Sequence, residues 1–272
     1  MQDQPIISPL GQPFIELQSI DSTNNYALTC LRNGTARHGT AFFAQEQKAG
    51  KGQWGRKWEA EKGANIALSI VIDPKPLLIS MQFQLSACLA LSVQKFFSRY
   101  GGTDTRIKWP NDLYWQDRKA GGILIENSIG GKQEIPDPAA ARPGISDPST
   151  DWKWAVAGIG ININQTRFPS DLPNPVSLKQ ITGKDHPVVP LAKELCRITN
   201  DYFTLLLSTG FDTVYKEYND SLYKLNETVK LKKDTRVFYT VIKGVSPAGQ
   251  LITRNNGVEE SFDFGEVSWV IE

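Results

Sequence analysis

Residues Gln47–Trp58 read QKAGKGQWGRKW, a segment with three glycines, four cations and two tryptophans. Glycine loses more backbone freedom on ordering than any other residue, so the segment is predicted to be a loop. Like charges held this close repel one another unless an anion lies between them. The segment therefore predicts a loop that closes over an anionic ligand, with backbone N–H groups and cations meeting its oxygens.

The sequence on either side of this loop predicts an α+β fold. Residues from Leu225 onward change in character, because short strand patterns follow one another with turns at Pro247–Gly249 and Asn256–Gly257. Five strands in so short a tail predict a small β-barrel. The Pro-, Gly- and Asp-rich segment Gly130–Asp151 is expected to be a mobile hairpin excursion. Strands are predicted in residues 14–20, 40–45, 65–72, 105–110, 112–129 with a turn at 116–118, and 153–164, and helices in residues 21–34, 80–102, 188–207 and 211–219.

Composition limits the classes of function. The chain has 272 residues and a formal net charge of +1, so nothing attracts the whole molecule to nucleic acid, and a basic site has to be local. No segment approaches the apolar length of a membrane span, and the N-terminus lacks a signal-peptide pattern, so we expect a cytoplasmic protein without membrane contact. Three scattered cysteines and two histidines argue against a disulfide framework, a zinc site or a histidine-based triad.

The glycine loop has two other interpretations. Gly50–Gly55 has the G-x-x-x-x-G spacing of a phosphate-binding P-loop, but Arg56 and Lys57 stand where that motif needs Lys and Ser or Thr. A P-loop also opens directly into a helix, whereas KWEAEKGAN leads into a predicted strand. A solvated basic hairpin is the second interpretation. Trp54 and Trp58 disfavour it, because exposed tryptophans on a flexible loop need something to cover.

Taken together, the motifs of the chain resemble those of biotin protein ligases. The loop resembles that family's GRGRxGRxW segment, with Lys51 in place of an arginine and Gln53 and Trp54 in place of the usual arginine-containing pair. The tail, which ends FGEVSWVI, looks like the family's small C-terminal domain. The other matching motifs follow in the family's order: DSTN at residues 21–24, KWPNDLYW at 108–115, KAGGILIE at 119–126 and GIGININ at 158–164.

The resemblance implies a fold and a reaction. The fold would be an α+β catalytic domain in residues 1–223, built on a mixed sheet with helices mainly on one side, and an SH3-like β-barrel in residues 224–272. The enzyme would be a ligase that forms a carbon–nitrogen bond. It would use Mg²⁺ and ATP to activate biotin as biotinyl-5′-AMP, and then transfer biotin to a lysine of a biotin carboxyl carrier protein.

The resemblance also assigns residues. The biotin carboxylate and the ATP phosphates are both anions, so their reaction would need fixed cations. The ureido ring of biotin is neutral, so its pocket would need hydroxyl and amide groups. Asp112 would help bind Mg²⁺. Trp58 could close over the ligand or anchor the core. The remaining assignments are Lys119 and Arg56 as catalytic residues, Ser22, Thr23, Gln47, Gly50, Lys51 and Lys119 for biotin, and Arg56, Trp58, Asn111 and Asn162 for the nucleotide.

Several points stay open in the sequence. A lipoate or octanoate transferase of the related fold and a non-catalytic biotin-binding protein are the alternatives to the ligase. Only about a dozen residues precede the first predicted strand, so no DNA-binding domain and no DNA binding are expected. The oligomeric state is open, with a homodimer as one candidate. The effect of Gln53 and Trp54 on retention of the adenylate, and the role of Gly130–Asp151 in acceptor recognition, are open as well.

Overall fold

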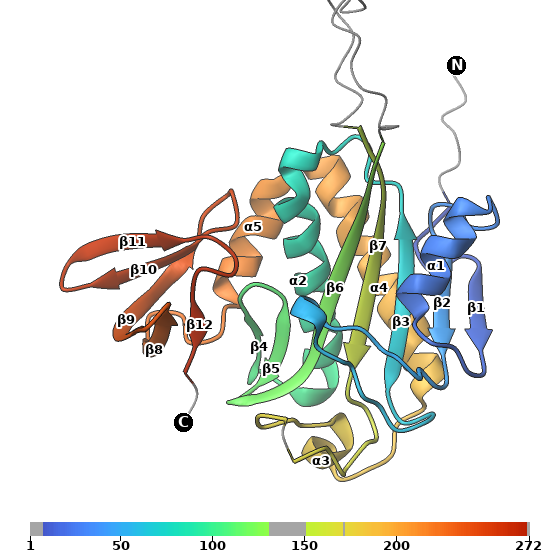
Figure 1. The fold of residues 1–272 in the computed structure, drawn as a ribbon, viewed down its shortest axis with the longest axis horizontal. Helices are drawn as coiled ribbons and strands as arrows, with labels where there is room; N and C mark the ends of the chain where they lie inside the picture. The colour runs from blue at the N-terminus through green and yellow to red at the C-terminus, as the bar shows by residue number, and fades with distance from the viewer. Residues whose placement is uncertain (1–7, 131–150, 171, 271–272) are drawn as a thin grey trace, which may run out of the picture.

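The computed structural model describes residues 8–130, 151–170 and 172–270, and its main element is a seven-stranded sheet (Figure 1). Along the sheet the order is β1-β2-β3-β7-β6-β5-β4. β1 and β2 are parallel and the other neighbours are antiparallel, so the sheet is mixed as predicted. The strands are β1 (Phe14–Leu17), β2 (Ala41–Ala44), β3 (Ile66–Ile72), β4 (Thr105–Lys108), β5 (Asp112–Trp115), β6 (Arg118–Gly130) and β7 (Asp151–Ile161).

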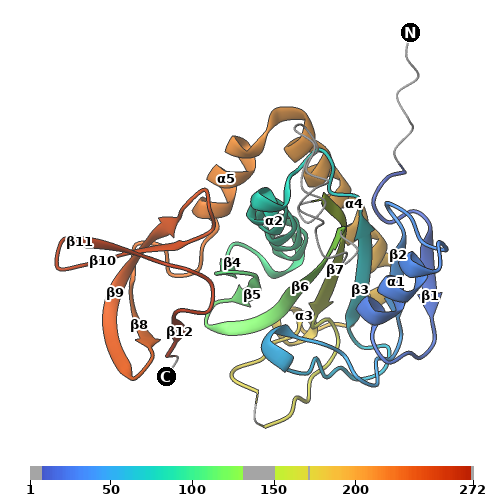
Figure 2. The same cartoon turned by 45° about the horizontal axis from the view of Figure 1, so that its top comes forward.

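Helices cover the two faces of this sheet unequally. In Figures 1 and 2, α2 and α4 lie behind β3, β6 and β7, while α1 lies in front of β2 and β3. α5 packs beside α2 and α4. The described part of the chain thus places most of its helical mass on one face, as the predicted α+β fold required. The helices are α1 (Thr23–Arg32), α2 (Gln82–Gly101), α3 (Leu178–Thr182), α4 (Val188–Thr209) and α5 (Phe211–Asp220).

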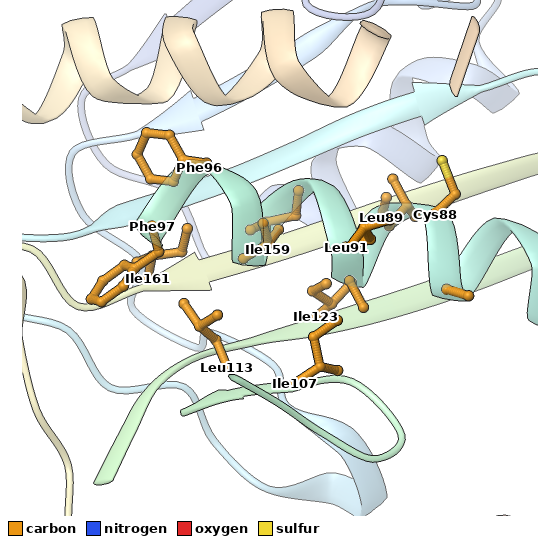
Figure 3. Close-up of a cluster of buried hydrophobic side chains, with 14 of the residues drawn as sticks. Cys88, Leu89, Leu91, Phe96, Phe97, Ile107, Leu113, Ile123, Ile159 and Ile161 are labelled. Carbon is orange, nitrogen blue, oxygen red and sulfur yellow. The ribbon is translucent and has the colours of Figure 1, made fainter. Parts of the chain in front are cut away.

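The hydrophobic core lies between the sheet and α2. Successive side chains of a strand point to opposite faces. In β7, Ile159 and Ile161 therefore face the helices, while Gly158 and Gly160 face the other way. Figure 3 shows Phe97 of α2 beside Ile161, with residues of β4, β5 and β6 completing the cluster. The sheet can therefore use one face for stability and leave the other for a site.

A second, antiparallel sheet follows α5, in the strand order β11-β10-β9-β8-β12. Its five strands agree with the number predicted for the tail. It contacts the first sheet through Trp109, whose indole Nε1 donates to the carbonyl of Gly249 at 2.9 Å, and its buried side chains belong to the same apolar cluster. The boundary near residue 223 therefore stays a prediction. The strands are β8 (Thr228–Lys233), β9 (Arg236–Val245), β10 (Leu251–Asn255), β11 (Val258–Phe262) and β12 (Ser268–Trp269).

Local details differ from the sequence-based expectations. The second helix begins at Gln82 after a 3-10 turn at Ile79–Met81, two residues later than predicted. α3 was not predicted, although Ser177 and Gln180 form a capping box at its start. The proposed hairpin excursion falls on residues 131–150, outside the described residues. None of the helices in the described ranges is long and apolar enough to cross a lipid bilayer.

Candidate functional site

A cavity of about 1050 Å³ opens on the sheet face opposite α2. The glycine loop forms one of its walls and crosses in front of β6 and β7 in Figures 1 and 2. β6 and β7 form its floor. The walls are completed by the β4–β5 connection, by the C-terminal segment from Phe264 to Trp269, and by Phe168, Pro169, Leu172, Pro173 and Pro175. Segments far apart in the sequence thus meet around one space.

The structure brings nearly all the predicted site residues to this cavity. Ten of the eleven assigned side chains or backbones line it: Ser22, Thr23, Gln47, Lys51, Arg56, Trp58, Asn111, Asp112, Lys119 and Asn162. Gly50 does not line it. Gly50 is buried behind the wall, where its carbonyl accepts the N–H of Trp58 at 2.9 Å.

Neutral polar side chains form one end of the cavity. The Oε1 atom of Gln47 accepts the backbone N–H of Thr23 at 2.8 Å and lies 3.0 Å from its hydroxyl. Ser22 stands at the N-cap position of α1, but its side chain makes no capping hydrogen bond. The residue is buried all the same. Its hydroxyl is therefore left for another partner, which suits a ligand-binding role better than a capping role.

The glycine loop is folded into a small hairpin. Lys51 and Lys57 form an isolated antiparallel bridge, and the N–H of Gly52 donates to the carbonyl of Arg56 at 2.7 Å. The Nζ atom of Lys51 lies 3.3 Å from a carboxylate oxygen of Glu126 on β6. This ion pair ties the loop to the floor of the cavity.

The indole ring of Trp58, at the end of the glycine loop, packs against Gly160 of β7. A Cβ atom at Gly160 would lie 2.5 Å from the indole ring, so only glycine lets the ring pack this closely. The indole Nε1 is buried and has no hydrogen-bond partner among the described residues. A buried donor without an acceptor is costly, and a ligand oxygen would relieve that cost. Trp58 therefore belongs to the cavity wall rather than to the apolar core.

Lys119 and Asp112 form an ion pair on the cavity floor. The Nζ atom of Lys119 lies 2.6 Å from Oδ1 of Asp112 across the β5–β6 ladder. A Cβ atom at Gly122 would lie 3.1 Å from that carboxylate oxygen, so the glycine admits the pair. Both side chains are only partly buried. The pair holds a cation in place while leaving it accessible to a ligand.

Lys108 is a further cation that sequence reasoning did not single out. Its Nζ atom lies 3.3 Å from the hydroxyl of Tyr114 and above the rings of Tyr114 and Trp269, at 4.8 and 5.3 Å from their centroids. Burial, opposed by the charge of Asp112 and assisted by the charges of Lys119 and Arg56, lowers the pKa of Lys108 to about 8. Its partner across the β4–β5 ladder is Asp112, which pairs with Lys119 instead.

The two predicted asparagines brace the backbone of the site. The Nδ2 group of Asn111 donates to the carbonyl of Ile123 on β6. That of Asn162 donates to the carbonyl of Val176 at 3.1 Å and lies 3.4 Å from that of Lys119. Both amide groups therefore donate within the protein, and the Oδ1 atoms and the second N–H of Asn111 are left to meet a ligand.

Magnesium suits the residues around Asp112. No group of three histidine, cysteine, aspartate or glutamate side chains that could hold a metal occurs in the described residues. Mg²⁺ commonly binds through one or two carboxylates, with phosphate oxygens and water as its other ligands. Asp112 next to an anion-binding cavity is consistent with such a site.

Comparison with known proteins agrees with this geometry. The model of the biotin/lipoate A/B protein ligase family matches residues 16–135. The biotin–[acetyl-CoA-carboxylase] ligase of Paracoccus denitrificans is 30% identical over 266 residues, covering 92% of this chain and 98% of the relative. The chain belongs to the biotin protein ligase family. It is therefore a ligase, as the motifs predicted.

Other relatives of the ligase extend over most of its length. The bifunctional ligase/repressor BirA of Escherichia coli is 28% identical over 256 residues, which covers 93% of this chain and 72% of the relative. The solved structure of the biotin protein ligase from Aquifex aeolicus in complex with biotin and ATP has a TM-score of 0.74 and 25% identity. The match covers 93% of this chain and 97% of that one.

Three polar residues of the ligase site escaped the sequence analysis besides Lys108. Glu126, Asn24 and Ser69 are joined by hydrogen bonds beside the polar end of the cavity. Asn24 and Glu126 are 102 positions apart in the sequence, so no local pattern connects them. Asn24 and Glu126 both lie within recognised motifs, DSTN and KAGGILIE. Their positions in these motifs, to which no role had been assigned, could have identified them as site residues.

Proposed function

We propose that the ligase activates biotin with ATP to biotinyl-5′-AMP and then transfers biotin to a lysine of a biotin carboxyl carrier protein. The observation that carries this proposal is the presence of a neutral polar end and a cationic floor in one cavity. The ureido ring of biotin has two N–H donors and a carbonyl acceptor, which suits hydroxyl and amide groups. Its carboxylate and the ATP phosphates are anions, which suits Lys119 and Arg56.

The first step brings two anions together. A carboxylate oxygen of biotin attacks the α-phosphorus of ATP, a mixed anhydride forms, and the bond to pyrophosphate breaks. Because the reactants repel each other, the protein contributes mainly by positioning them and by neutralising their charge. Lys119 would contact both the carboxylate and the α-phosphate. Arg56 would bridge two phosphoryl oxygens with its guanidinium group.

The ion pair of Lys119 and Asp112 can be exchanged during this step. When phosphate oxygens arrive, Lys119 would turn from Asp112 toward them. Asp112 would then be free to hold Mg²⁺, which supplies positive charge to the phosphates when bound. Trp58 would donate its unpaired N–H to the nucleotide, and the Oδ1 atoms of Asn111 and Asn162 would face it.

The polar end would hold the ureido ring. Ser22, Thr23 and Gln47 would meet its donors and its carbonyl, with the backbone of Lys51 adding a contact, whereas Gly50, which does not line the cavity, would shape the loop behind it. In the second step the amine of the acceptor lysine attacks the anhydride carbonyl, an amide forms, and AMP leaves. The closed loop would protect the anhydride from water until the acceptor arrives.

We also propose a domain organisation, a cellular location and an assembly for the ligase. We propose that residues 1–223 form the catalytic domain and that the second sheet, in residues 224–272, is an SH3-like barrel. The cytoplasm is the proposed location, and the net charge of +1 gives no reason to propose DNA binding. A homodimer remains a candidate assembly.

Pyrophosphate release tests the proposed reaction. Purified protein given Mg-ATP should release pyrophosphate when biotin is added, and should label a biotin carboxyl carrier protein. Equal or greater release with lipoate or octanoate would favour the related acyltransferases instead. Binding of biotin without pyrophosphate release would indicate a non-catalytic biotin-binding protein.

Replacement of Lys119 tests its role. Lys119→Ala should slow pyrophosphate release by about 10²–10³-fold, because loss of one preorganised charged donor typically costs about 3–4 kcal/mol of transition-state stabilisation. Lys179→Ala is the matched control, since Lys179 is similarly exposed and pairs with Asp185 at 2.7 Å, outside the cavity lining. Near wild-type release by Lys119→Ala would remove Lys119 from the mechanism.

A further inference from the structure

Glu126 connects the glycine loop to the polar end of the cavity. Its Oε1 atom lies 3.3 Å from Nζ of Lys51 on the loop. Its Oε2 atom accepts a hydrogen bond from Nδ2 of Asn24 on α1 at 2.8 Å. The carboxylate is therefore shared between the segment that covers the cavity and the helix that carries Ser22 and Thr23 at its start.

Asn24 links Glu126 to the buried hydroxyl of Ser69 through its side-chain amide. A carboxylate only accepts hydrogen bonds, so the Asn24 amide has to present its NH₂ group to Glu126 and its oxygen to the opposite side. On that side, the hydroxyl of Ser69 lies 2.5 Å from Oδ1 of Asn24. A Cβ atom at Gly158 would lie 2.5 Å from the same Oδ1 atom, so β7 leaves space for this amide.

The hydroxyl protons of Ser69 and Thr23 determine whether the Thr23 oxygen can accept a hydrogen bond from a ligand. Ser69 has one hydroxyl proton, and the Asn24 oxygen has none, so the Ser69 proton is needed between these two. Oγ of Ser69 is also 2.7 Å from Oγ1 of Thr23, which in turn is 3.0 Å from Oε1 of Gln47. The Thr23 proton can only serve one of these two neighbours. Because the Ser69 proton is directed to Asn24, Thr23 accepts no proton from Ser69, and both lone pairs of its oxygen stay available as acceptors.

We propose that Glu126 is a positioning residue of the ligase. Through Asn24 and Ser69 it fixes Thr23 as a hydrogen-bond acceptor for a ligand N–H, and through Lys51 it holds the glycine loop over the same end of the cavity. This inference rests on the proposed biotin-activating function, since the ureido ring supplies the N–H donor. The Lys51–Glu126 pair is partly exposed, and such pairs are weak, so the loop can still open.

Glu126→Gln tests the inference because it keeps the size of the side chain. The neutral amide can meet Asn24 with its oxygen or with its NH₂ group, so only the longer contact of Asn24 Nδ2 with the carbonyl of Leu124, at 3.4 Å, still favours one orientation. When Asn24 turns, the Ser69 proton is released toward Thr23, which is then no longer kept free as an acceptor. Calorimetry on the full chain should show a biotin dissociation constant raised by up to about tenfold, the effect of one weakened neutral hydrogen bond between Thr23 and the ureido ring. The KM for ATP should stay unchanged, a separation that a general structural defect would not produce.

A double-mutant cycle identifies the route of the effect. In a Thr23→Val background, Glu126→Gln should weaken biotin binding no further, because its target is already absent. In a Lys51→Met background, Glu126→Gln should not speed the escape of biotinyl-AMP further. Glu16→Gln is the matched control, since Glu16 is a partly exposed glutamate on β1 that pairs with Lys193 at 3.4 Å.

The possible outcomes are distinct. An unchanged biotin dissociation constant in Glu126→Gln, or the same loss in the presence and absence of Thr23→Val, would overturn the role of Glu126 while the proposed function stands. Failure of the wild-type chain to bind biotin would overturn the proposed function, and this inference with it.

Discussion

The two faces of the seven-stranded sheet are built from the same strands and serve opposite purposes. On β3, Leu68 and Ile70 pack under the helices, whereas Ser69 between them joins the polar residues beside the cavity. β7 repeats the pattern, with Ile159 packed against α2 and Gly160 against Trp58. Large apolar side chains fill one face, and small or polar residues leave room on the other. Stability and ligand binding should therefore be separable by mutation.

The largest effect is expected on the helix-covered face. Phe97 of α2 is fully buried in the cluster of Figure 3. Phe97→Ala should lower the free energy of unfolding by about 3–5 kcal/mol, because buried apolar surface is lost and a cavity remains. Chemical denaturation measures this change, with Leu78→Ala as an exposed control. A loss below about 1 kcal/mol would contradict the assignment of stability to this face.

A substitution on the cavity face should weaken ligand binding and leave the stability nearly unchanged. Gly160→Ala would place a methyl group against the Trp58 ring and push the glycine loop away from β7. Overpacking of this kind typically costs about 1–3 kcal/mol, so affinity for biotinyl-AMP should fall by roughly ten- to a hundredfold. The free energy of unfolding should change little, since the loop can move. If stability fell while affinity held, the two faces would not be independent.

Lys108 is a half-buried cation in the cavity wall, where it can affect both ligand binding and stability. Lys108→Met should raise the KM for ATP by about tenfold, the effect of one charge-assisted hydrogen bond to phosphate. Biotin affinity should be unchanged, because the polar end of the cavity is not touched. The melting temperature should hold or rise, since burial of an ammonium group without a carboxylate partner opposes folding. A lower melting temperature together with an unchanged KM would make Lys108 a structural residue.

The smallest expected effect is a pH dependence at His38. Its Nδ1 atom accepts the backbone N–H of Asp73 at 3.0 Å, and its ring lies 5.8 Å from that of Phe203 on α4. Burial lowers the pKa of His38 below its ordinary value, against the opposing charge of Asp73. The contribution to stability is thus full above the ordinary value of about 6.5 and is lost as the pH falls below it.

Substitution of His38 measures that dependence. His38→Gln keeps an acceptor in the side chain but removes the titrating ring. Between pH 7 and pH 5 the wild-type protein should lose more stability than His38→Gln, as followed by thermal unfolding at each pH. Equal losses would show that the ring does not titrate in this range.

Much of the fold could be predicted from the sequence because its signals are local. The turn at residues 116–118 and the strands on either side of it follow from short alternating patterns, and α2 follows from its helical periodicity. β3 was predicted in residues 65–72 and lies at Ile66–Ile72, although all seven of its residues are buried. Its neighbours on both sides, β2 and β7, explain this burial.

The site was predictable where a motif carried it and not where contacts crossed the chain. Lys119, Arg56 and Thr23 could be assigned because each lies in a recognisable motif, and all three line the cavity. Glu126 and Lys108 could not, because their roles depend on Asn24 and Trp269, which are distant in sequence. A hydrogen bond between residues about a hundred positions apart cannot be inferred from a local sequence pattern.

The central claim is that the cavity face of the sheet orients biotin and ATP for adenylate formation. A crystal structure of the protein with biotinyl-5′-AMP tests it most directly. We expect the ureido ring beside Thr23 and Gln47, and Nζ of Lys119 within hydrogen-bond distance of the phosphate or of the acyl oxygens of the anhydride. An adenylate bound in the reverse direction, or outside this cavity, would contradict the claim.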